Sequence, residues 1–266
     1  MSVFVAEELS EVLNTKVVIG RINMGLLNRI IIDDVLLDDQ SGQEMLKVTR
    51  LSAKFDIMPF FKGKISISSV QLFGFNINLR KETPDSPPNF KFVLDAFASK
   101  DTVKKENSLD LRINSILIRR GRMSYHVLSE EETPGKFNAK HIQLQNIIAN
   151  ISLKALSKDS LNLGIKRLSL DEKASGFSLK KMSLKLVANN KQTNIDNFTI
   201  ELPETSLKLD TIHLEYDSLK AFDRFTEQVH FSFRTLPSQV TLKDISPFVP
   251  ILSHFKEPVT LDMEVK

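Results

Sequence analysis

The sequence predicts a mainly β protein built around a curved sheet. Three observations lead to this prediction: most apolar residues alternate with polar ones in steps of two, few segments have helical spacing, and one irregular step recurs along the chain. The alternation is plain near the end, where Val259, Leu261, Met263 and Val265 are separated by single residues. Strands of this kind have one face toward water and one face away from it.

The composition limits the classes of function. The chain has 266 residues, 41% of them hydrophobic, which is enough for one large β unit or two ordinary domains. Its net charge is only +3, from 36 basic and 33 acidic residues, and does not demand a nucleic-acid partner. The absence of cysteine excludes disulfides, thiolate metal sites and a cysteine nucleophile. No run approaches the ~20 apolar residues of a membrane-spanning helix.

Helical spacing is confined to a few segments. Residues 2–14 predict an amphipathic opening helix that ends at Asn14 and Thr15. A second helix is predicted in "NFKFVLDAF" after the breaker run "TPDSPP", and a third in "AFDRFTEQV". In "DISPFVPILSHF", Pro250 would kink or end a fourth helix.

Strands are predicted between these helices, among them 65–72, 109–118, 123–127 and 259–265. Many carry the same irregular step: an apolar residue, two mostly polar residues, then apolar, any, apolar. Two polar residues in sequence would turn every later apolar side chain to the wrong face unless the strand absorbs one extra residue as a bulge. Bulges in neighbouring strands would curl the whole sheet into a trough. Nine copies begin at Ile32, Val48, Ile67, Ile113, Ala139, Ile165, Leu179, Ile195 and Leu209.

Residues 15–81 resemble a known family. The match lies in the order of "VVIG" after an amphipathic helix, "IDDVLLDDQSG", "VTRLSAKFDIMPFFKGK" and "ISSVQLFGFNINL". In this order the segment resembles the amino-terminal region of the TamB branch of the AsmA-like (bridge-like lipid transfer) superfamily, most closely the Bacteroidota type. Weaker similarity continues through "LDLRINSILIRRGRMSYHV" and "SLKLDTIHLEY", so it covers essentially the whole chain.

The resemblance implies a periplasmic protein that is anchored in the inner membrane by an amino-terminal helix and acts in outer-membrane biogenesis. In such proteins a long antiparallel sheet forms an open apolar groove, or β-taco, that carries phospholipid acyl chains. This chain lacks the anchor helix and the carboxy-terminal domain expected to meet an outer-membrane assembly protein. We therefore expect an amino-terminal piece of a longer protein, with no cofactor.

Four regions are expected on this basis. Residues 1–14 form the helix that follows the missing anchor, and 15–82 form the first β unit. Residues 83–107 form a Pro-rich connection with a short helix, and 108–266 continue the groove, truncated at its carboxy-terminal end.

The apolar residues around the double polar steps are the candidates for the groove wall. Alternation alone favours the closed core of a sandwich or barrel, which is the commoner fate of such strands, and the resemblance reverses this preference toward the open groove. The candidates are Ile67, Val70, Leu72, Ile113, Ile116, Ile118, Ile142, Leu144, Ile165, Leu168, Leu170, Met182, Leu184, Phe198, Ile200, Ile212 and Leu214.

Catalytic and metal sites find little support, and we predict no enzyme and no metal. The five histidines are His126, His141, His213, His230 and His254; they lie far apart in the sequence, and no His-x-x-x-His pair occurs. The acidic residues of "IDDVLLDDQSG" do not have calcium-loop spacing, and "DDQSG" reads as a hairpin turn. The basic run "IRRGR" lacks the aromatic partners of a nucleic-acid site and reads as solvent-facing strand charge.

Two other functions compete with lipid transport. Exposed sheet edges could template strands of outer-membrane proteins during their assembly. An extracellular carbohydrate-binding sandwich would show aromatic platforms, which zero Trp and two Tyr argue against.

Overall fold

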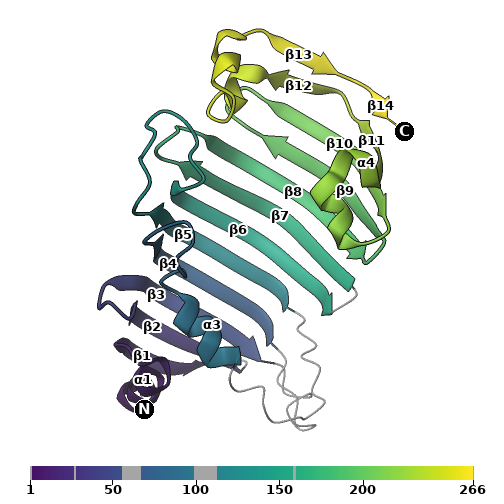
Figure 1. Cartoon of the computed structure of the whole chain (residues 1–266). Coiled ribbons are helices and arrows are strands. Elements are labelled where there is room, and N and C mark those ends of the chain that lie inside the picture. Colours follow the sequence, from purple (N-terminus) through teal and green to yellow (C-terminus); the bar gives the residue numbers. More distant parts are fainter. Residues whose placement is uncertain (1, 27, 56–66, 99–112, 158–159, 266) are drawn as a thin grey trace.

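The protein is one long curved sheet with short helices at its rims (Figure 1). The computed structural model describes residues 2–26, 28–55, 67–98, 113–157 and 160–265. The strands are β1 (Val17–Gly25), β2 (Arg29–Asp38), β3 (Glu44–Phe55), β4 (Ile67–Lys81), β5 (Ile113–Val127), β6 (His141–Ser157), β7 (Ser160–Glu172), β8 (Ser178–Asn189), β9 (Gln192–Glu201), β10 (Ser206–Tyr216), β11 (Val229–Thr235), β12 (Ser238–Thr241), β13 (Pro258–Leu261) and β14 (Glu264–Val265). The helices are α1 (Ser2–Leu13), α3 (Lys91–Ala98) and α4 (Phe225–Gln228), with 3-10 turns η2 (Leu219–Arg224), η3 (Leu242–Ile245) and η4 (Pro250–His254).

The strands follow one another across the sheet in chain order. The path runs from β1 to β11 and then to β14, while β12 pairs with β10 and β13. Neighbouring described strands are antiparallel with one exception, because β4 and β5 run parallel. A parallel pair needs a crossover connection, and residues 82–112, which include α3, provide it. The sequence predicts a mainly antiparallel sheet correctly but gives no sign of this parallel pair.

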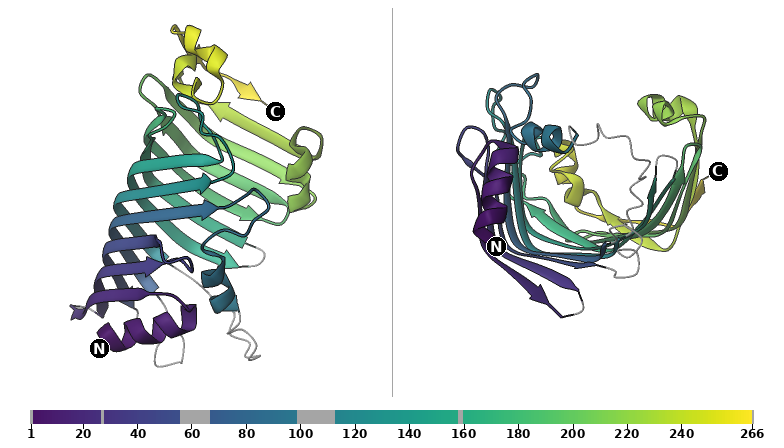
Figure 2. Two further views of the ribbon diagram at one scale, coloured as in Figure 1. Left: turned by 60° about the vertical axis from the view of Figure 1, so that its left-hand side comes forward. Right: turned by 90° about the horizontal axis from the view of Figure 1, so that it is seen from below.

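The sheet stays open and bends into a trough (Figure 2). Seen from below, α1 and α3 lie along one rim, and η2 and α4 lie along the other. The fold class is therefore confirmed as a long curved open sheet with a few short helices, and a closed sandwich or barrel is excluded.

The predicted bulges are present in most of the strands that carry the double polar step. In β5, Ile113 pairs with Leu153 and Ile116 with Ile151, so β5 advances three residues where β6 advances two. One of the two residues Asn114 and Ser115 is therefore extra relative to β6. This bulge keeps Ile113 and Ile116 on the same face of the sheet. Register shifts of this kind fall at the copies that begin at Ile67, Ile113, Ile165, Leu179, Ile195 and Leu209.

The other three copies behave differently. At the copies that begin at Ile32 and Val48, the strand keeps its register with both neighbouring strands. The reason is that β1 to β4 interrupt their alternation at the same level of the sheet. At this level Asp34 and Gly74 have φ of 56° and 63°, in the left-handed region. The copy at Ala139 straddles the turn before β6, which begins at His141, so its prediction as a bulge was wrong.

The amino-terminal helix covers the first strands. Ala6 of α1 is buried against Val17 and Ile19 of β1, with Val93 of α3 packed against the same cluster. Asn14 follows the helix with φ of 48°, a left-handed residue that ends it as predicted. Two strands are expected to start at residues 65 and 109. Their first residues lie outside the described part of the chain.

The remaining helical predictions hold in shortened form. "AFDRFTEQV" forms η2 and the four-residue α4 instead of one helix. In "DISPFVPILSHF", Pro250 occupies the first turn of η4, where its missing N–H is tolerated.

Candidate functional site

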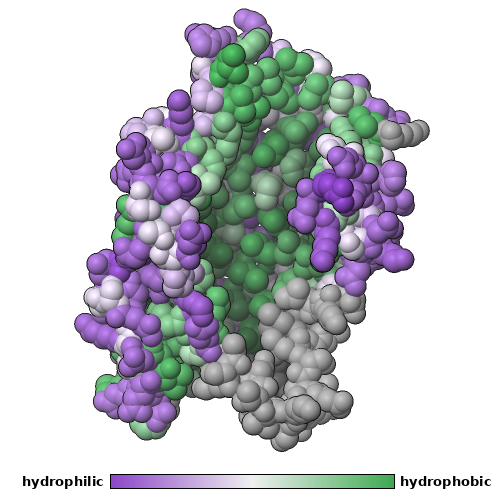
Figure 3. Space-filling view, viewed as in Figure 1, coloured by the Kyte–Doolittle hydropathy of each residue, from purple (hydrophilic) through white to green (hydrophobic). Residues whose placement is uncertain are grey.

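The concave face of the sheet is the main candidate site. Figure 3 shows this face hollowed, with hydrophobic residues gathered along it and hydrophilic residues at its sides. Helices α1 and α3 pack over its first strands.

Strand register aligns the apolar residues of this face into rows that cross the strands. One row runs through Ile32, Leu51, Leu72, Ile118, Ala149, Leu168, Met182, Ile200 and Leu207. A second runs through Ile30, Ala53, Val70, Ile116, Ile151, Ile165 and Leu184. A third runs through Ile113, Leu153, Leu163, Leu186, Ile195, Ile212 and Phe233.

These rows bring together most of the residues singled out from the sequence. Of the other candidates, Leu144 and Leu170 pack with Leu72 and Ile118 around one buried cluster. Ile142, Phe198 and Leu214 lie two residues from Leu144, Ile200 and Ile212, and Ile67 lies just before the bulge that precedes Val70. Strand alternation and the bulges therefore put all of them on one face.

The burial of these residues distinguishes the face from a closed core. All seventeen candidates are half-buried except Ile113, which is 8% exposed. Core residues of a sandwich are covered by a second sheet, whereas these side chains touch their neighbours in the sheet and keep part of their surface toward the hollow.

An aromatic series lies where the concave face meets η2 and α4. The ring centroids of successive residues lie 4.9, 6.0, 5.7 and 6.4 Å apart along the series. Phe222, Phe225 and Phe231 remain 38–40% exposed. Sequence spacing groups Phe222 and Phe225, but Tyr216, Phe231 and Phe233 join them only through the pairing of β10 with β11. The series is Tyr216, Phe222, Phe225, Phe231 and Phe233.

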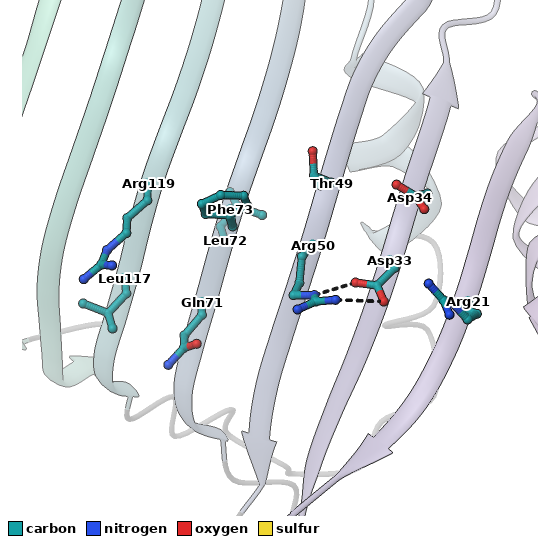
Figure 4. A pocket seen from close by; sticks show the side chains of 10 residues that line it. All are labelled: Arg21, Asp33, Asp34, Thr49, Arg50, Gln71, Leu72, Phe73, Leu117 and Arg119. Atoms are coloured by element: carbon teal, nitrogen blue, oxygen red, sulfur yellow. Dashed lines mark hydrogen bonds and ion pairs between the residues drawn. The ribbon is translucent and has the colours of Figure 1, made fainter.

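The opposite, convex face carries charged side chains over its first strands, among them Arg21, Asp33 and Arg50. A shallow depression of about 610 Å³ on this face is lined by side chains from β1 to β5, which Figure 4 shows. Arg50 Nε donates to Asp33 Oδ1 at 2.6 Å, and its NH2 group donates to Oδ2 at 3.3 Å. This pairing lowers the pKa of Asp33, although burial opposes it.

Arg120 stacks on Phe73 with 5.1 Å from its guanidinium carbon to the ring centroid. The basic run "IRRGR" is thus exposed strand charge, as predicted.

Two histidines that are distant in the sequence meet in the structure. His126 of β5 and His141 of β6 are direct partners in register, and their Nδ1 atoms lie 3.0 Å apart. The carboxylate of Glu132 lies near both, with the three ligand atoms within 4.8 Å of one another. The sequence does not indicate this cluster, because 13 residues separate the two strands and their register cannot be read from the spacing.

Of the acidic residues of "IDDVLLDDQSG", Asp33 forms the ion pair with Arg50, and Asp39 holds a turn. Asp39 Oδ1 accepts hydrogen bonds from Ser41 N at 3.0 Å, Ser41 Oγ at 2.6 Å and Gln43 N at 3.2 Å. This carboxylate closes the turn between β2 and β3, which agrees with the hairpin predicted from "DDQSG".

No family model, curated protein or solved structure matches the chain. Among the described residues, no helix has the length and apolar character needed to span a bilayer. The resemblance of residues 15–81 to TamB-like proteins therefore stays a prediction.

Proposed function

We propose that the concave face is an apolar groove that carries phospholipid acyl chains, as part of a TamB-like or AsmA-like bridge between the inner and outer bacterial membranes. The observation that supports it is the row of apolar residues, most of them half-buried, that continues from strand to strand between β2 and β10 along an open face. Localisation in the periplasm and an anchor in the inner membrane belong to the same proposal and rest on the sequence resemblance.

The physical basis is the transfer of methylene groups from water to the apolar wall. Each buried CH₂ contributes about 0.8 kcal/mol, so a two-tailed lipid would bind firmly. The hydrophobic effect has no direction, so the tails can slide from one row of side chains to the next. Such transport needs no catalytic residue and no cofactor.

The length of the face suits this role. Strands in a sheet lie about 4.8 Å apart, so the path from β1 to β11 extends on the order of 50 Å along the rows. This exceeds the ~30 Å hydrocarbon core of a whole bilayer. The face is therefore long enough to hold several lipids in succession, whereas a pocket for a single ligand would end within a few strands.

Site-specific photo-crosslinking tests the proposal. A photoreactive amino acid is placed at Val70, Ile116 or Leu168 on the concave face, and the protein is irradiated after expression in a Gram-negative host. Native mass spectrometry should then find phospholipid adducts at all three positions.

Matched controls lie one residue away on the opposite face. Gln71 and Leu117 are partners in register, and Asn150 connects Leu117 to Arg167. The crosslinker at Gln71, Leu117 or Arg167 should give no lipid adduct. Equal labelling of the two faces, or adducts with protein alone, would contradict the proposal.

A second candidate function is a scaffold for assembly of outer-membrane proteins. The observation in its favour is the open sheet, because among the described strands β1 pairs only with β2 and leaves one edge without a strand partner. Exposed edges can accept an added strand. A crosslinker at Arg21 in β1 would then capture unfolded outer-membrane protein, while positions on the concave face would capture no lipid.

A further inference from the structure

The histidine pair between β5 and β6 has the geometry of a cation site. Two nitrogens that each lie 2.0–2.1 Å from one cation are separated by about 2.9 Å at a right angle and about 3.4 Å at the tetrahedral angle. The Nδ1 atoms of His126 and His141 are 3.0 Å apart, within that interval. The ring planes are tilted by 52°, so the two rings are not stacked on each other.

The outer nitrogen of His141 is already oriented. Its Nε2 lies 2.9 Å from the carbonyl oxygen of Glu130, which can only accept, so Nε2 carries the proton. The neutral ring then presents an unprotonated Nδ1 toward His126. A backbone carbonyl that fixes the second nitrogen in this way is the usual support of a metal-bound histidine. His141 is 7% exposed, so its ring is held in place by its surroundings.

The third group comes from the loop between the two strands. Glu132 is exposed, and one of its carboxylate oxygens lies within 4.8 Å of a ring nitrogen of each histidine. Because Glu132 is exposed, its side chain can change rotamer when a metal ion binds. The nearby cations are neutralised: Arg80, the register partner of His126, pairs with Asp39 at 2.6 Å, and Lys140 pairs with Glu130 at 2.6 Å.

We propose that Nδ1 of His126, Nδ1 of His141 and a carboxylate oxygen of Glu132 bind a divalent first-row metal ion of the zinc class. Two imidazoles and one carboxylate suit Zn²⁺ and similar ions better than Ca²⁺ or Mg²⁺, which prefer oxygen alone. Without the ion, the proton of His126 Nδ1 makes the hydrogen bond to His141. With the ion, His126 carries its proton on Nε2, and both Nδ1 lone pairs face the metal.

The site would fasten the β5–β6 loop to the rim of the sheet. This loop also contacts the carboxy-terminal part, since Phe137 N donates to Pro247 O at 2.8 Å and the rings of Phe137 and Phe248 lie 4.8 Å apart. Metal binding at Glu132 would thus stabilise the contact between the middle and the end of the chain. This role is independent of lipid carriage on the other face.

Metal binding by the intact chain tests the inference with Zn²⁺ alone as the probe. Isothermal titration of metal-free protein should show one tight site, and Co²⁺ in its place should give visible d–d absorption. His126→Gln should weaken Zn²⁺ binding at least tenfold and remove the absorption. Glu132→Gln, at an exposed position, should weaken binding less and leave the fold intact by circular dichroism.

The matched control is His254→Gln, which removes an exposed histidine on η4. It should bind Zn²⁺ as the unaltered protein does. Equal affinity in His126→Gln and the unaltered chain, or no saturable binding at micromolar Zn²⁺, would overturn the site and leave the two histidines as a hydrogen-bonded pair.

Discussion

Two buried carboxylates, Asp39 and Glu172, close hairpin turns of the sheet. Each is 2% exposed. Burial alone would raise the pKa of both, but hydrogen bonds outweigh it and hold each pKa below its usual value. Asp39 accepts from Ser41, Gln43 and Asn89, and Glu172 accepts from backbone N–H groups and Ser175. A buried charge of this kind stabilises the fold only while it keeps all its donors.

Replacing Asp39 by Asn should destabilise the protein by about 1.5–3 kcal/mol at neutral pH, because charge-assisted hydrogen bonds are lost beside Arg80. The pKa of Asp39 is lowered in the folded state, so its contribution is complete above the ordinary pKa of about 3.9 and disappears as the pH falls through the lowered value. Urea unfolding at a series of pH values should show the difference between the variants shrinking in acid.

The exposed Asp85→Asn is the control and should change the free energy of unfolding little at any pH. A difference between Asp39→Asn and the unaltered protein that stayed constant down to pH 2 would contradict the assignment.

At Gly121, the ring of a neighbouring side chain leaves no room for a Cβ atom. A Cβ atom added there would lie 2.4 Å from the ring of Phe75, a buried residue of the neighbouring strand. Gly121→Ala should therefore cost about 1–3 kcal/mol through overpacking. The double variant with Phe75→Leu should lose less than the sum of the two single variants, as measured in a double-mutant cycle by chemical denaturation. Simple additivity would mean that the ring does not set the requirement for glycine.

At the scale of the element, the strands keep one apolar face by breaking their own alternation. Residues inside strands adopt positive φ at Asp34, Gly74, Arg120, Asn146 and Asn197. Such a residue does not continue a regular strand, so the chain bends there. Because the breaks of β2 and β4 lie at one level of the sheet, these strands bend together.

Asn197 tests this device, because it is exposed and lies in a double polar step of β9. Asn197→Val should destabilise by about 1–2 kcal/mol, since a β-branched residue disfavours φ near 53°. Asn197→Gly should be neutral or slightly stabilising. Lys185→Val, at an exposed position of the adjacent strand where φ is not positive, should change stability little. The midpoint of thermal unfolding of the three variants measures these differences. An unchanged midpoint in Asn197→Val would show that the bend tolerates regular strand geometry.

The sequence predicts this device because two polar residues between apolar ones disturb a pattern with a period of two. The pattern does not distinguish a copy inside a strand from one at the strand's end. The copy that begins at Ala139 was therefore wrongly predicted to be a bulge. The pairing of His126 with His141 depends on a register that a long loop conceals. The parallel pair of β4 and β5 depends on where the chain returns after residues 82–112, which local composition does not encode.

At the scale of the whole molecule, the concave face leaves apolar side chains in contact with the hollow. Contiguous apolar surface of this kind binds the dye 1-anilinonaphthalene-8-sulfonate. We expect delipidated native protein to enhance its fluorescence while its near-ultraviolet circular dichroism stays native. Added lysophospholipid should displace the dye, and Leu168→Glu should weaken dye binding more than Arg167→Glu on the opposite face. Dye binding only after loss of the native dichroism would contradict an open apolar face.

The parallel pair of β4 and β5 also sets an order in time. Strands β1 to β4 are consecutive and antiparallel, as are β5 to β11, so each group can pair through local contacts while the chain is still being made. Joining the groups requires closure across residues 82–112, which carries an additional entropic cost. Pulse-labelling hydrogen exchange during refolding should protect the amides between β2 and β3 before those between β4 and β5. The trough would then be assembled from two growing halves that meet at one seam.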